Sequence, residues 1–396
     1  MSTQIEDKPL GQATMSLHSD RSLENGMAVA PAIHQSVNHL TEDGVAFAHK
    51  ATEPLNDQFY CRHGNPTSSR IAKIIADLEG SQAAMMFASG MSAITTTILT
   101  FVENGDHIIA QENLYSATAS FLSRFLPKYG VDVTFVDQRS IESFERAITP
   151  KTKIIYVETP SNPLLSITDI RRVSELAIAN NVITICDNTL ATPINQKPIG
   201  LGVDLVVHSA TKYIGGHHDL LAGCVTGPAN YLRTIWDVSM DLGPIAAPFN
   251  SWLALRGVRT LKLRVLQHNS SALLIAQQLE EHPKVGTVYY PGLTSHPQHD
   301  LARKQMRSFG GILTFDMLGG YEAAGTFIQN TQLCMNAPSL GGVDTLVSQP
   351  AVMFSARLNK KEIQAQDIRP GMIRMSVGIE DVADLQHDID RALFSI

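Results

Sequence analysis

The chain has 396 residues, of which 44% are hydrophobic, and its formal net charge is −7 at pH 7. This length suggests two or three domains around a large buried core. The mildly acidic balance argues against non-specific binding to nucleic acid and, more weakly, against an anionic membrane as a partner. No apolar run approaches the roughly 20 residues that a membrane-spanning helix needs.

Cysteine usage and the N-terminus indicate the compartment. Cys61, Cys186, Cys224 and Cys334 form no CxxC pair and no zinc-binding pattern. Free thiols in a chain of this size are typical of a reducing environment. The polar N-terminus lacks the apolar segment of a secretion signal. We therefore predict a soluble cytoplasmic protein without a metal site.

The first 60 residues carry few signs of regular structure. Residues 1–30 are polar with few apolar anchors, and residues 42–58 have no clear period, which indicates an arm or a long loop. A helix is expected after Pro66, with Ser68 or Ser69 as its N-cap and Gly80 at its end. The apolar residues that follow the helical spacing are Ile71, Ile74, Ile75 and Leu78.

Short β-rich segments then alternate with helix-compatible segments. The predicted strands lie within 83–88, 106–111, 131–137, 153–158, 182–187, 204–209 and 221–227. This alternation is typical of an α/β fold with a mainly parallel sheet covered by helices. A long helical stretch from about 251 to 281 precedes strands and helices that indicate a smaller α/β domain.

Lys212 follows Ser209 and Thr211 directly after a predicted buried strand. A lysine amine can form a Schiff base when burial or a nearby cation lowers its pKa. Gly215 and Gly216 would let the backbone approach a ligand closely. The alternative is a solvated loop lysine, since most lysines are exposed.

Asp187 ends another apolar strand, where a carboxylate often only caps a turn. Pyridoxal 5′-phosphate (PLP) needs an acid for a different reason. A carboxylate keeps its pyridine nitrogen protonated, so that the ring can accept electrons from a substrate carbanion. The interval between Asp187 and Lys212 has room for one helix and one strand. Both residues would then lie at C-terminal strand ends, where open α/β sheets bind ligands.

Two further segments fit such a cofactor. Residues 88–93 join a strand to a helix start, whose free N–H groups and dipole can bind an anion. An ordinary strand–helix turn is the alternative, but with Ser209 and Thr211 this turn would form a phosphate cup. Tyr115 follows the next strand and is either a packing residue or a ring stacked on PLP that also moves protons.

These elements, in this order, resemble the Cys/Met-metabolism family of PLP enzymes. That family includes cystathionine γ-synthase, cystathionine and methionine γ-lyases, cystathionine β-lyase and O-acetylhomoserine sulfhydrylase. The resemblance runs from about Ala30 to the C-terminus. Its motifs are FYCRHGNPT (59–67), ASGMSA (88–93), NLYSAT (113–118), VETPSNP (157–163), DNT (187–189), HSATKYIGGHHD (208–219), LRGVRTLKLR (255–264), PSLGG (338–342) and IRMSVGIED (373–381).

The resemblance implies the aspartate-aminotransferase-like fold, known as fold type I. It implies an N-terminal arm (1–64), a large PLP-binding domain (65–256) and a smaller C-terminal α/β domain (257–396). It also implies a homotetramer, a dimer of dimers in which the neighbouring subunit's arm completes each active site.

The resemblance further implies a role for each matching residue. Lys212 would carry PLP and act as the base, Tyr115 would stack on the ring and donate a proton, and Asp187 would pair with the pyridine nitrogen. The phosphate contacts from the same subunit would be Gly90, Met91, Ser209 and Thr211. Those from the adjacent subunit would be Tyr60 and Arg62. The residues around the substrate α-carboxylate would be Arg374, Ser339 and Asn162.

The expected pocket for the distal end of the substrate departs from the family pattern. Ser116-Ala117 replaces the usual Gly-Gly or Gly-Cys, so the reactive cysteine of methionine γ-lyases is absent. Leu190-Ala191 replaces an aromatic-small pair. Pro338 stands where cystathionine users commonly have Glu and methionine γ-lyases have Val. The remaining departures are Gln349, Phe354 and Ser355.

The implied reaction is γ-elimination on a γ-substituted L-amino acid, through a vinylglycine-type intermediate, giving a 2-oxo acid and ammonia. Methionine, cystathionine, an O-acyl-homoserine and canavanine remain open as substrates. Because Pro338 offers neither a charge nor an N–H donor, we expect weak recognition of cystathionine. γ-Replacement is the second candidate and β-elimination the third. An aminotransferase, which the motifs argue against, and a non-enzymatic PLP-binding protein are alternatives from other classes.

Overall fold

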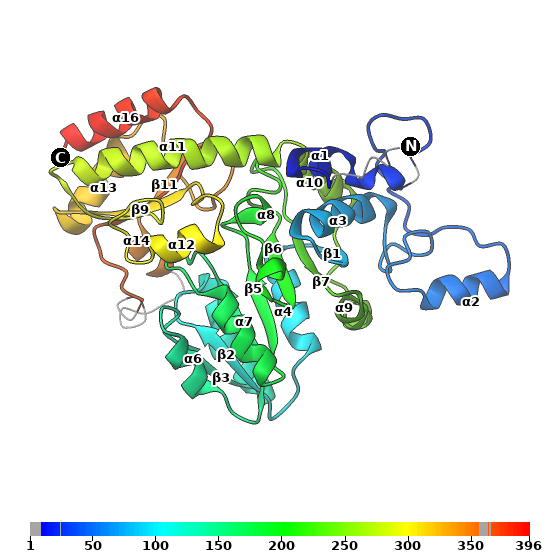
Figure 1. Cartoon of the computed structure of the whole chain (residues 1–396). Helices are drawn as coiled ribbons and strands as arrows, with labels where there is room; N and C mark the ends of the chain where they lie inside the picture. Colours follow the sequence, from blue (N-terminus) through cyan, green and yellow to red (C-terminus); the bar gives the residue numbers. More distant parts are fainter. Residues whose placement is uncertain (1–8, 24, 356–362, 364–365) are drawn as a thin grey trace, which may run out of the picture.

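The computed structural model describes residues 9–23, 25–355, 363 and 366–396. A seven-stranded sheet forms its centre, with the order β1-β7-β6-β5-β4-β2-β3 (Figure 1). β7 is antiparallel to both of its neighbours, and the other pairs are parallel. The prediction of a mainly parallel sheet is therefore confirmed. Its strands are β1 (Ala83–Phe87), β2 (His107–Gln111), β3 (Asp132–Val136), β4 (Thr152–Glu158), β5 (Ile183–Asp187), β6 (Leu205–Ser209) and β7 (Gly223–Gly227).

Helices cover both faces of this sheet, which explains why its central strands bury apolar side chains on both sides, whereas the edge strand β3 is partly exposed. Successive side chains of a strand point to opposite faces. In β4, Ile154 and Tyr156 pack in the core beneath α4 and α9, whereas Ile155 and Val157 pack in the core beneath α6 and α7. The helices of this region are α3 (Pro66–Glu79), α4 (Gly90–Thr100), α5 (Ser116–Ser120), α6 (Ile141–Ala147), α7 (Ile170–Ala179), α8 (Thr192–Asn195), α9 (Ala229–Leu242) and α10 (Pro248–Val258).

A smaller, five-stranded sheet follows the long helix α11 (Leu261–Glu281), with the order β10-β11-β12-β9-β8. Helices α11, α13 and α16 enclose its own hydrophobic core. Leu261 and Val265, at the start of α11, pack instead in the core of the large sheet. The division into an arm, a large domain and a C-terminal domain stays a prediction. The remaining elements are β8 (Val285–Tyr289), α12 (His299–Gln305), β9 (Ile312–Met317), α13 (Gly320–Asn330), β10 (Met335–Asn336), β11 (Leu346–Ser348), α14 (Pro350–Ser355), β12 (Met372–Ser376) and α16 (Val382–Phe394).

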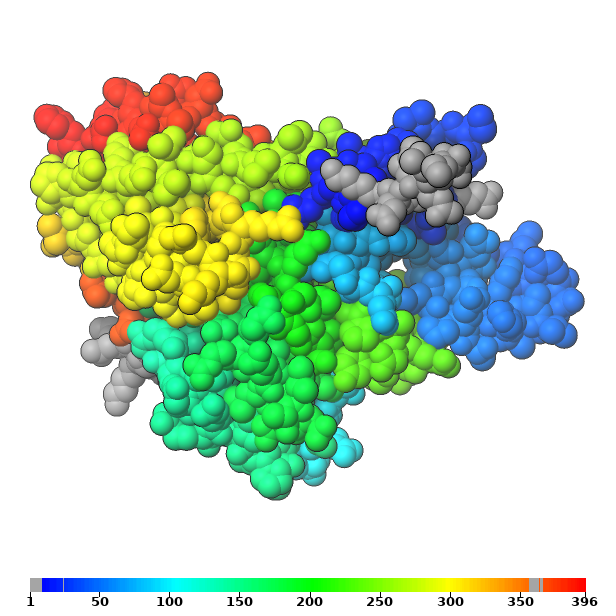
Figure 2. Space-filling model, in the orientation of Figure 1, coloured from blue at the N-terminus to red at the C-terminus, as the bar shows by residue number. Residues whose placement is uncertain are grey.

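The arm projects from one side of the molecule, as the blue segments of Figures 1 and 2 show. It carries α2 (Gly44–Thr52), which has no buried residue and is capped by the Asp43 side chain. The helix α3 begins earlier than predicted. Its N-cap is Asn65, whose Oδ1 accepts from the Thr67 amide at 2.9 Å, so the prediction of Ser68 or Ser69 is wrong. Gly80 closes the helix in the left-handed conformation, as predicted.

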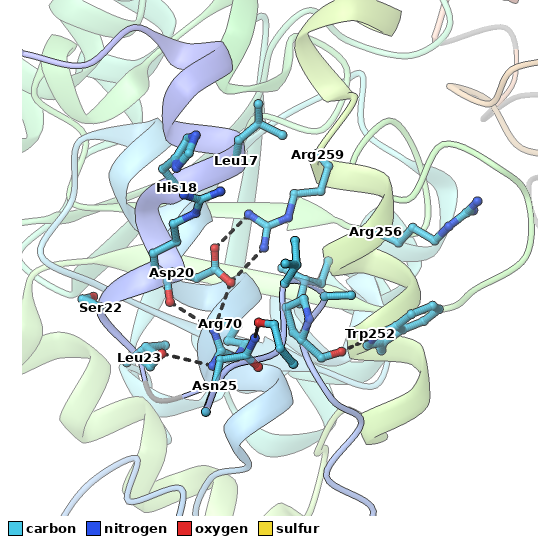
Figure 3. Close-up of a pocket in the computed structure, with 17 residues that line it drawn as sticks. Leu17, His18, Asp20, Ser22, Leu23, Asn25, Arg70, Trp252, Arg256 and Arg259 are labelled. Atoms are coloured by element: carbon cyan, nitrogen blue, oxygen red, sulfur yellow. Dashed lines mark hydrogen bonds and ion pairs between the residues drawn. The ribbon is translucent and has the colours of Figure 1, made fainter.

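The expectation that residues 1–30 lack structure is wrong for α1 (Gln12–His18) and the 3-10 helix at Ser19–Ser22. Met15 is one of the few apolar anchors of this segment, and ion pairs also hold it against the body of the molecule. Asp20 accepts two hydrogen bonds of 2.8 Å from Arg259 and one of 3.2 Å from Arg70. Figure 3 shows these three side chains together among the residues that line a cavity. The cavity has a volume of about 930 Å³ and is lined by the N-terminal segment and by residues of α3 and α10.

Replacing Asp20 with alanine should lower the free energy of unfolding by about 3–5 kcal/mol, because it removes a buried carboxylate that accepts hydrogen bonds from both Arg259 and Arg70. Denaturant unfolding followed by circular dichroism measures this change. Glu42→Ala is the control, since Glu42 forms an exposed pair with Lys50 and should lose at most about 1 kcal/mol. Equal losses in the two variants would contradict the anchoring role of Asp20.

Candidate active site

A cavity of about 550 Å³ opens where β4, β5 and β6 end, and the C-terminal domain forms its opposite wall. Its volume is typical of a site for a small ligand. Every predicted site residue except Tyr60 and Arg62 lines this one cavity. These lining residues are Gly90, Met91, Tyr115, Asn162, Asp187, Ser209, Thr211, Lys212, Pro338, Ser339 and Arg374.

Lys212 lies in the turn after β6 and is largely buried. Its Nζ donates a hydrogen bond of 2.8 Å to the Ser339 hydroxyl, which belongs to the opposite wall. Burial and the positive charge of Arg374 lower the pKa of Lys212 to about 8. A larger fraction of this amine is therefore uncharged near neutral pH than for an exposed lysine, and only the uncharged form is a nucleophile.

The two glycines after Lys212 do not approach the cavity, contrary to the expectation. A Cβ at Gly216 would lie 2.0 Å from Nη1 of Arg264, and one at Gly215 would lie 2.9 Å from the Leu220 side chain. The Arg264 guanidinium donates to the Tyr213 and Gly257 carbonyls at 2.7 Å. Gly216 therefore leaves room for an arginine that holds the turn, and Gly215 leaves room for Leu220.

Asp187 is buried at the end of β5, at the side of the cavity formed by the large sheet. Its Oδ1 accepts from the Thr189 amide at 3.0 Å, and the Tyr156 hydroxyl approaches Oδ2 at 3.5 Å. Burial raises the pKa of Asp187 above its ordinary value, against the opposing influence of the Thr189 hydrogen bond and the His208 charge. A cationic group in the cavity would favour the ionised carboxylate.

Glu158, at the end of β4, also lines the cavity; it lies in the motif VETPSNP (157–163) but was not among the predicted site residues. Its carboxylate accepts from the Tyr115 amide at 2.9 Å and from the Asn162 amide at 3.3 Å. Burial and the neighbouring Asp187 raise the pKa of Glu158 to about 8. Glu158 thus holds the backbone of two predicted site residues in place.

The start of α4 is pressed against the end of β6. Ser89 and Ser92 form a capping box, with the Ser92 amide donating to the Ser89 hydroxyl at 3.1 Å. A Cβ added at Gly90 would lie 2.8 Å from the Cβ of Ser209, so only glycine fits. This contact joins a helix N-terminus to hydroxyl side chains, which together suit a phosphate group.

Arg374 projects from the C-terminal domain strand β12 and is buried. Its Nη2 donates to the Ser339 carbonyl at 2.8 Å, and Nη1 contacts Asn162 Oδ1 at 3.3 Å. Its Nε is buried without a hydrogen-bond partner among the described residues. Burial lowers the pKa of Arg374 to about 10. A carboxylate entering the cavity would supply the missing acceptor.

Ser339 accepts hydrogen bonds from both cationic side chains of the cavity, Lys212 and Arg374. Its backbone φ is 89°, a left-handed conformation that is uncommon for a residue other than glycine. In this conformation its carbonyl accepts from Arg374 while its hydroxyl accepts from Lys212. Such backbone outliers are concentrated at functional sites.

The region expected to hold the distal end of the substrate is mainly apolar. Pro338 is exposed at the rim, and Leu340, Met353 and Phe354 lie further in. Gln349 does not line this cavity, because its amide donates to the Tyr321 and Pro370 carbonyls. The hydroxyl of Ser355 donates to Val352, on the exposed side of α14. Of these three departures from the family pattern, only Phe354 contacts the cavity.

Tyr60 and Arg62 lie in the arm, outside the cavity of their own chain. The Arg62 guanidinium donates to the Met240 carbonyl at 2.6 Å and lies 5.6 Å from the centre of the Tyr60 ring.

The donor groups of the cavity fit PLP. A buried amine suits the cofactor aldehyde, a carboxylate suits the pyridine nitrogen, and the Gly90–Ser209 contact suits the phosphate. An open, mainly parallel α/β sheet with these groups at its C-terminal edge defines a PLP-dependent enzyme of fold type I. The chain belongs to the Cys/Met metabolism PLP-dependent enzyme family, whose family model matches residues 13–394. The predicted family and cofactor are confirmed.

Several relatives cover nearly the whole chain. An L-methionine γ-lyase of Porphyromonas gingivalis is 40% identical over 98% of both chains. Cystathionine γ-synthase 1 of Arabidopsis thaliana is 38% identical over 97% of this chain and 69% of its own length. The crystal structure of metB from Corynebacterium glutamicum superposes with a TM-score of 0.91 at 35% identity, covering 97% of this chain and 98% of that one. Proteins named cystathionine β-lyase also match.

Within the described residues, no helix is both long and apolar enough to cross a membrane.

Replacing Gly90 with alanine should cost about 1–3 kcal/mol of stability and weaken PLP binding, because the new methyl group forces α4 away from Ser209. Thermal unfolding and titration of the apoprotein with PLP measure the two effects. Gly325→Ala is the control, since nothing lies within 4 Å of that position in α13 and alanine favours a helix. Unchanged PLP affinity in Gly90→Ala would show that this contact does not shape the phosphate site.

Proposed function

We propose that this enzyme catalyses γ-elimination on a γ-substituted L-amino acid. The observation that carries the proposal is the pairing of Lys212, an amine with a lowered pKa, with Arg374 in one buried cavity. The first can act as the base at the substrate α-carbon, and the second can bind the α-carboxylate. The methionine γ-lyases among the relatives support this reaction.

The residues that would hold PLP follow from their positions around the cavity. The Lys212 amine would bind the cofactor aldehyde, Asp187 the pyridine nitrogen and Tyr115 one face of the ring. When bound, the cofactor stores the electrons released at the substrate α-carbon. The phosphate contacts would be Gly90, Met91, Ser209 and Thr211.

Proton transfer would depend on Lys212 and Tyr115. Lys212 is held by the Ser339 hydroxyl on the side of the cavity that carries Arg374, so a bound α-carboxylate would bring the α-proton near the amine. The Tyr115 side chain is half exposed, and its backbone is fixed by Glu158. We propose that its hydroxyl donates a proton to the departing γ-substituent.

γ-Replacement is the second candidate, because cystathionine γ-synthases are among the relatives. The two reactions share every residue named above and differ in whether a nucleophile adds at the γ-carbon. β-Elimination stands third, supported by the relatives named cystathionine β-lyase.

The distal end of the preferred substrate should carry no ammonium group. The charged residues among the described lining of the cavity are Glu158, Asp187, Lys212 and Arg374, and each already has a proposed partner or role. Pro338 at the rim offers neither a charge nor an N–H donor. Methionine, an O-acyl-homoserine and canavanine remain candidates, whereas cystathionine should be a poor substrate.

This proposal is tested by measuring kcat/KM for four substrates, with release of a 2-oxo acid as the signal. The substrates are methionine, O-acetylhomoserine, canavanine and cystathionine. We expect at least one of the first three to exceed cystathionine by tenfold or more, which corresponds to about 1.4 kcal/mol. Pro338→Glu should raise the ratio for cystathionine, and the uncharged control Pro338→Gln should not.

Two results would contradict the proposal in different ways. A tenfold preference of the unaltered enzyme for cystathionine would overturn the account of Pro338. If no amino acid yields a 2-oxo acid without an added nucleophile, γ-replacement becomes the better description.

We also propose a cytoplasmic homotetramer, built from dimers that share their active sites. Arg62 and Tyr60 lie outside the cavity of their own chain, on an arm that projects from the body, which supports a role in a neighbouring subunit. The four cysteines form no disulfide bond, which is consistent with the cytoplasm.

Arg62→Ala and Lys212→Ala should each be inactive alone, but their mixed dimers should regain part of the activity. A hybrid site can take Arg62 from one chain and Lys212 from the other. Mixed dimers purified through two different affinity tags allow this measurement, with homodimers of each variant as controls. Verified mixed dimers without activity would show that the sites are not shared.

A further inference from the structure

Glu79 is a buried carboxylate on the side of the large sheet that faces α3. It is the last residue of that helix and is 1% exposed. Its Oε1 accepts from His208 Nε2 at 2.7 Å and from Asn188 Nδ2 at 2.8 Å. Since burying a charge without partners is costly, these two contacts fix where the carboxylate lies.

Both partners of Glu79 are neighbours of cavity residues. Asn188 directly follows Asp187 at the end of β5, and His208 directly precedes Ser209 at the end of β6. The two strands are paired, with Asp187 opposite Val207, and the Asn188 amide donates to the Val207 carbonyl at 3.0 Å. Glu79 therefore bridges the two strand ends from outside the cavity.

The bridge is part of a larger polar network. Asn188 and Gln196 exchange two hydrogen bonds of 3.0 Å, from Nδ2 to the Gln196 carbonyl and from Nε2 back to Oδ1. Gln196 also donates to the Thr159 carbonyl at 2.9 Å. Asn188 is fully buried. Loss of Glu79 would therefore leave its Nδ2 group with the Gln196 carbonyl but without its second acceptor.

The network also acts on the charge of Asp187. A positive charge on His208 would favour the ionised form of Asp187. The Glu79 carboxylate contacts the His208 ring. The other titratable groups that Glu79 influences are Cys186, Cys224 and Lys197. None of these three lines the cavity.

We propose that Glu79 is a positioning residue for Asp187, acting through Asn188 and His208. It holds the end of β5 against β6 and keeps the Asp187 carboxylate directed into the cavity. This inference rests on the proposed role of Asp187 as partner of the PLP nitrogen. Glu79 itself does not line the cavity, so its effect on the cofactor would be transmitted through the strand ends.

The test is the affinity of the full-length apoprotein for PLP, measured by titration. Glu79→Ala should weaken PLP binding about tenfold, and Glu79→Gln, which keeps one oxygen acceptor, should weaken it less. Asp388→Asn is the matched control. Asp388 is a buried carboxylate of the C-terminal domain that accepts from the Gln332, Leu333 and Cys334 amides, so its loss should lower the melting temperature but not PLP affinity.

A double-mutant cycle separates positioning from general destabilisation. If Glu79 acts through Asp187, Glu79→Ala should weaken PLP binding much less in an Asp187→Ala background than in the unaltered protein. Should Glu79→Ala not fold, the same cycle is measured with Glu79→Gln.

Each contrary outcome identifies what failed. Unchanged affinity in the Glu79 variants, while Asp187→Ala loses PLP, overturns the role of Glu79 alone. An equal weakening by the Glu79 substitution with and without Asp187 also overturns it. If Asp187→Ala binds PLP normally, the proposed role of Asp187 fails, and the role of Glu79 with it.

Discussion

The active-site cavity buries two cations and two carboxylates that form no ion pairs among the described residues. These groups are Lys212, Arg374, Asp187 and Glu158. Burial of an unpaired charge is costly, and each group responds by a pKa shift toward its neutral form. The pKa values of Lys212 and Arg374 are lowered, and those of Asp187 and Glu158 are raised. A ligand with complementary charges relieves this cost.

The rest of the architecture serves to hold these groups apart and in place. Parallel strands bring Glu158 and Asp187 to one edge of the large sheet, and the mainly antiparallel C-terminal sheet supplies Arg374 from the other side. Ser339, in its left-handed conformation, contacts the cations from both domains. The position of the C-terminal sheet relative to the large sheet therefore determines the distance between the Lys212 amine and the Arg374 guanidinium.

The sequence predicted the residues that lie directly at strand ends. Asp187 and Lys212 follow apolar segments, and parallel strands place such residues at the same sheet edge. Glu158 occupies the same kind of position and lies in the motif VETPSNP (157–163), but the resemblance assigned it no role. Its contacts with the Tyr115 and Asn162 amides become visible only in the folded chain.

Long-range contacts account for what the sequence did not predict. The N-terminal helix depends on Asp20 and Arg259, which are far apart in the chain, so its polar sequence resembled a flexible tail. Gly216 looked suited to a ligand, whereas an arginine from α11 occupies the space beside it. Gln349 lies in the sequence region predicted to form the distal pocket. Its side-chain amide instead donates to two backbone carbonyls outside the cavity.

The central claim is that Lys212 is the residue that carries the cofactor in this cavity. Borohydride reduction of the holoenzyme, followed by peptide mapping, tests it directly, because reduction fixes the cofactor to the lysine that holds it. The account predicts a pyridoxyl group on Lys212. A pyridoxyl group on another lysine, such as the half-buried Lys197 whose pKa is also lowered by burial, would contradict it.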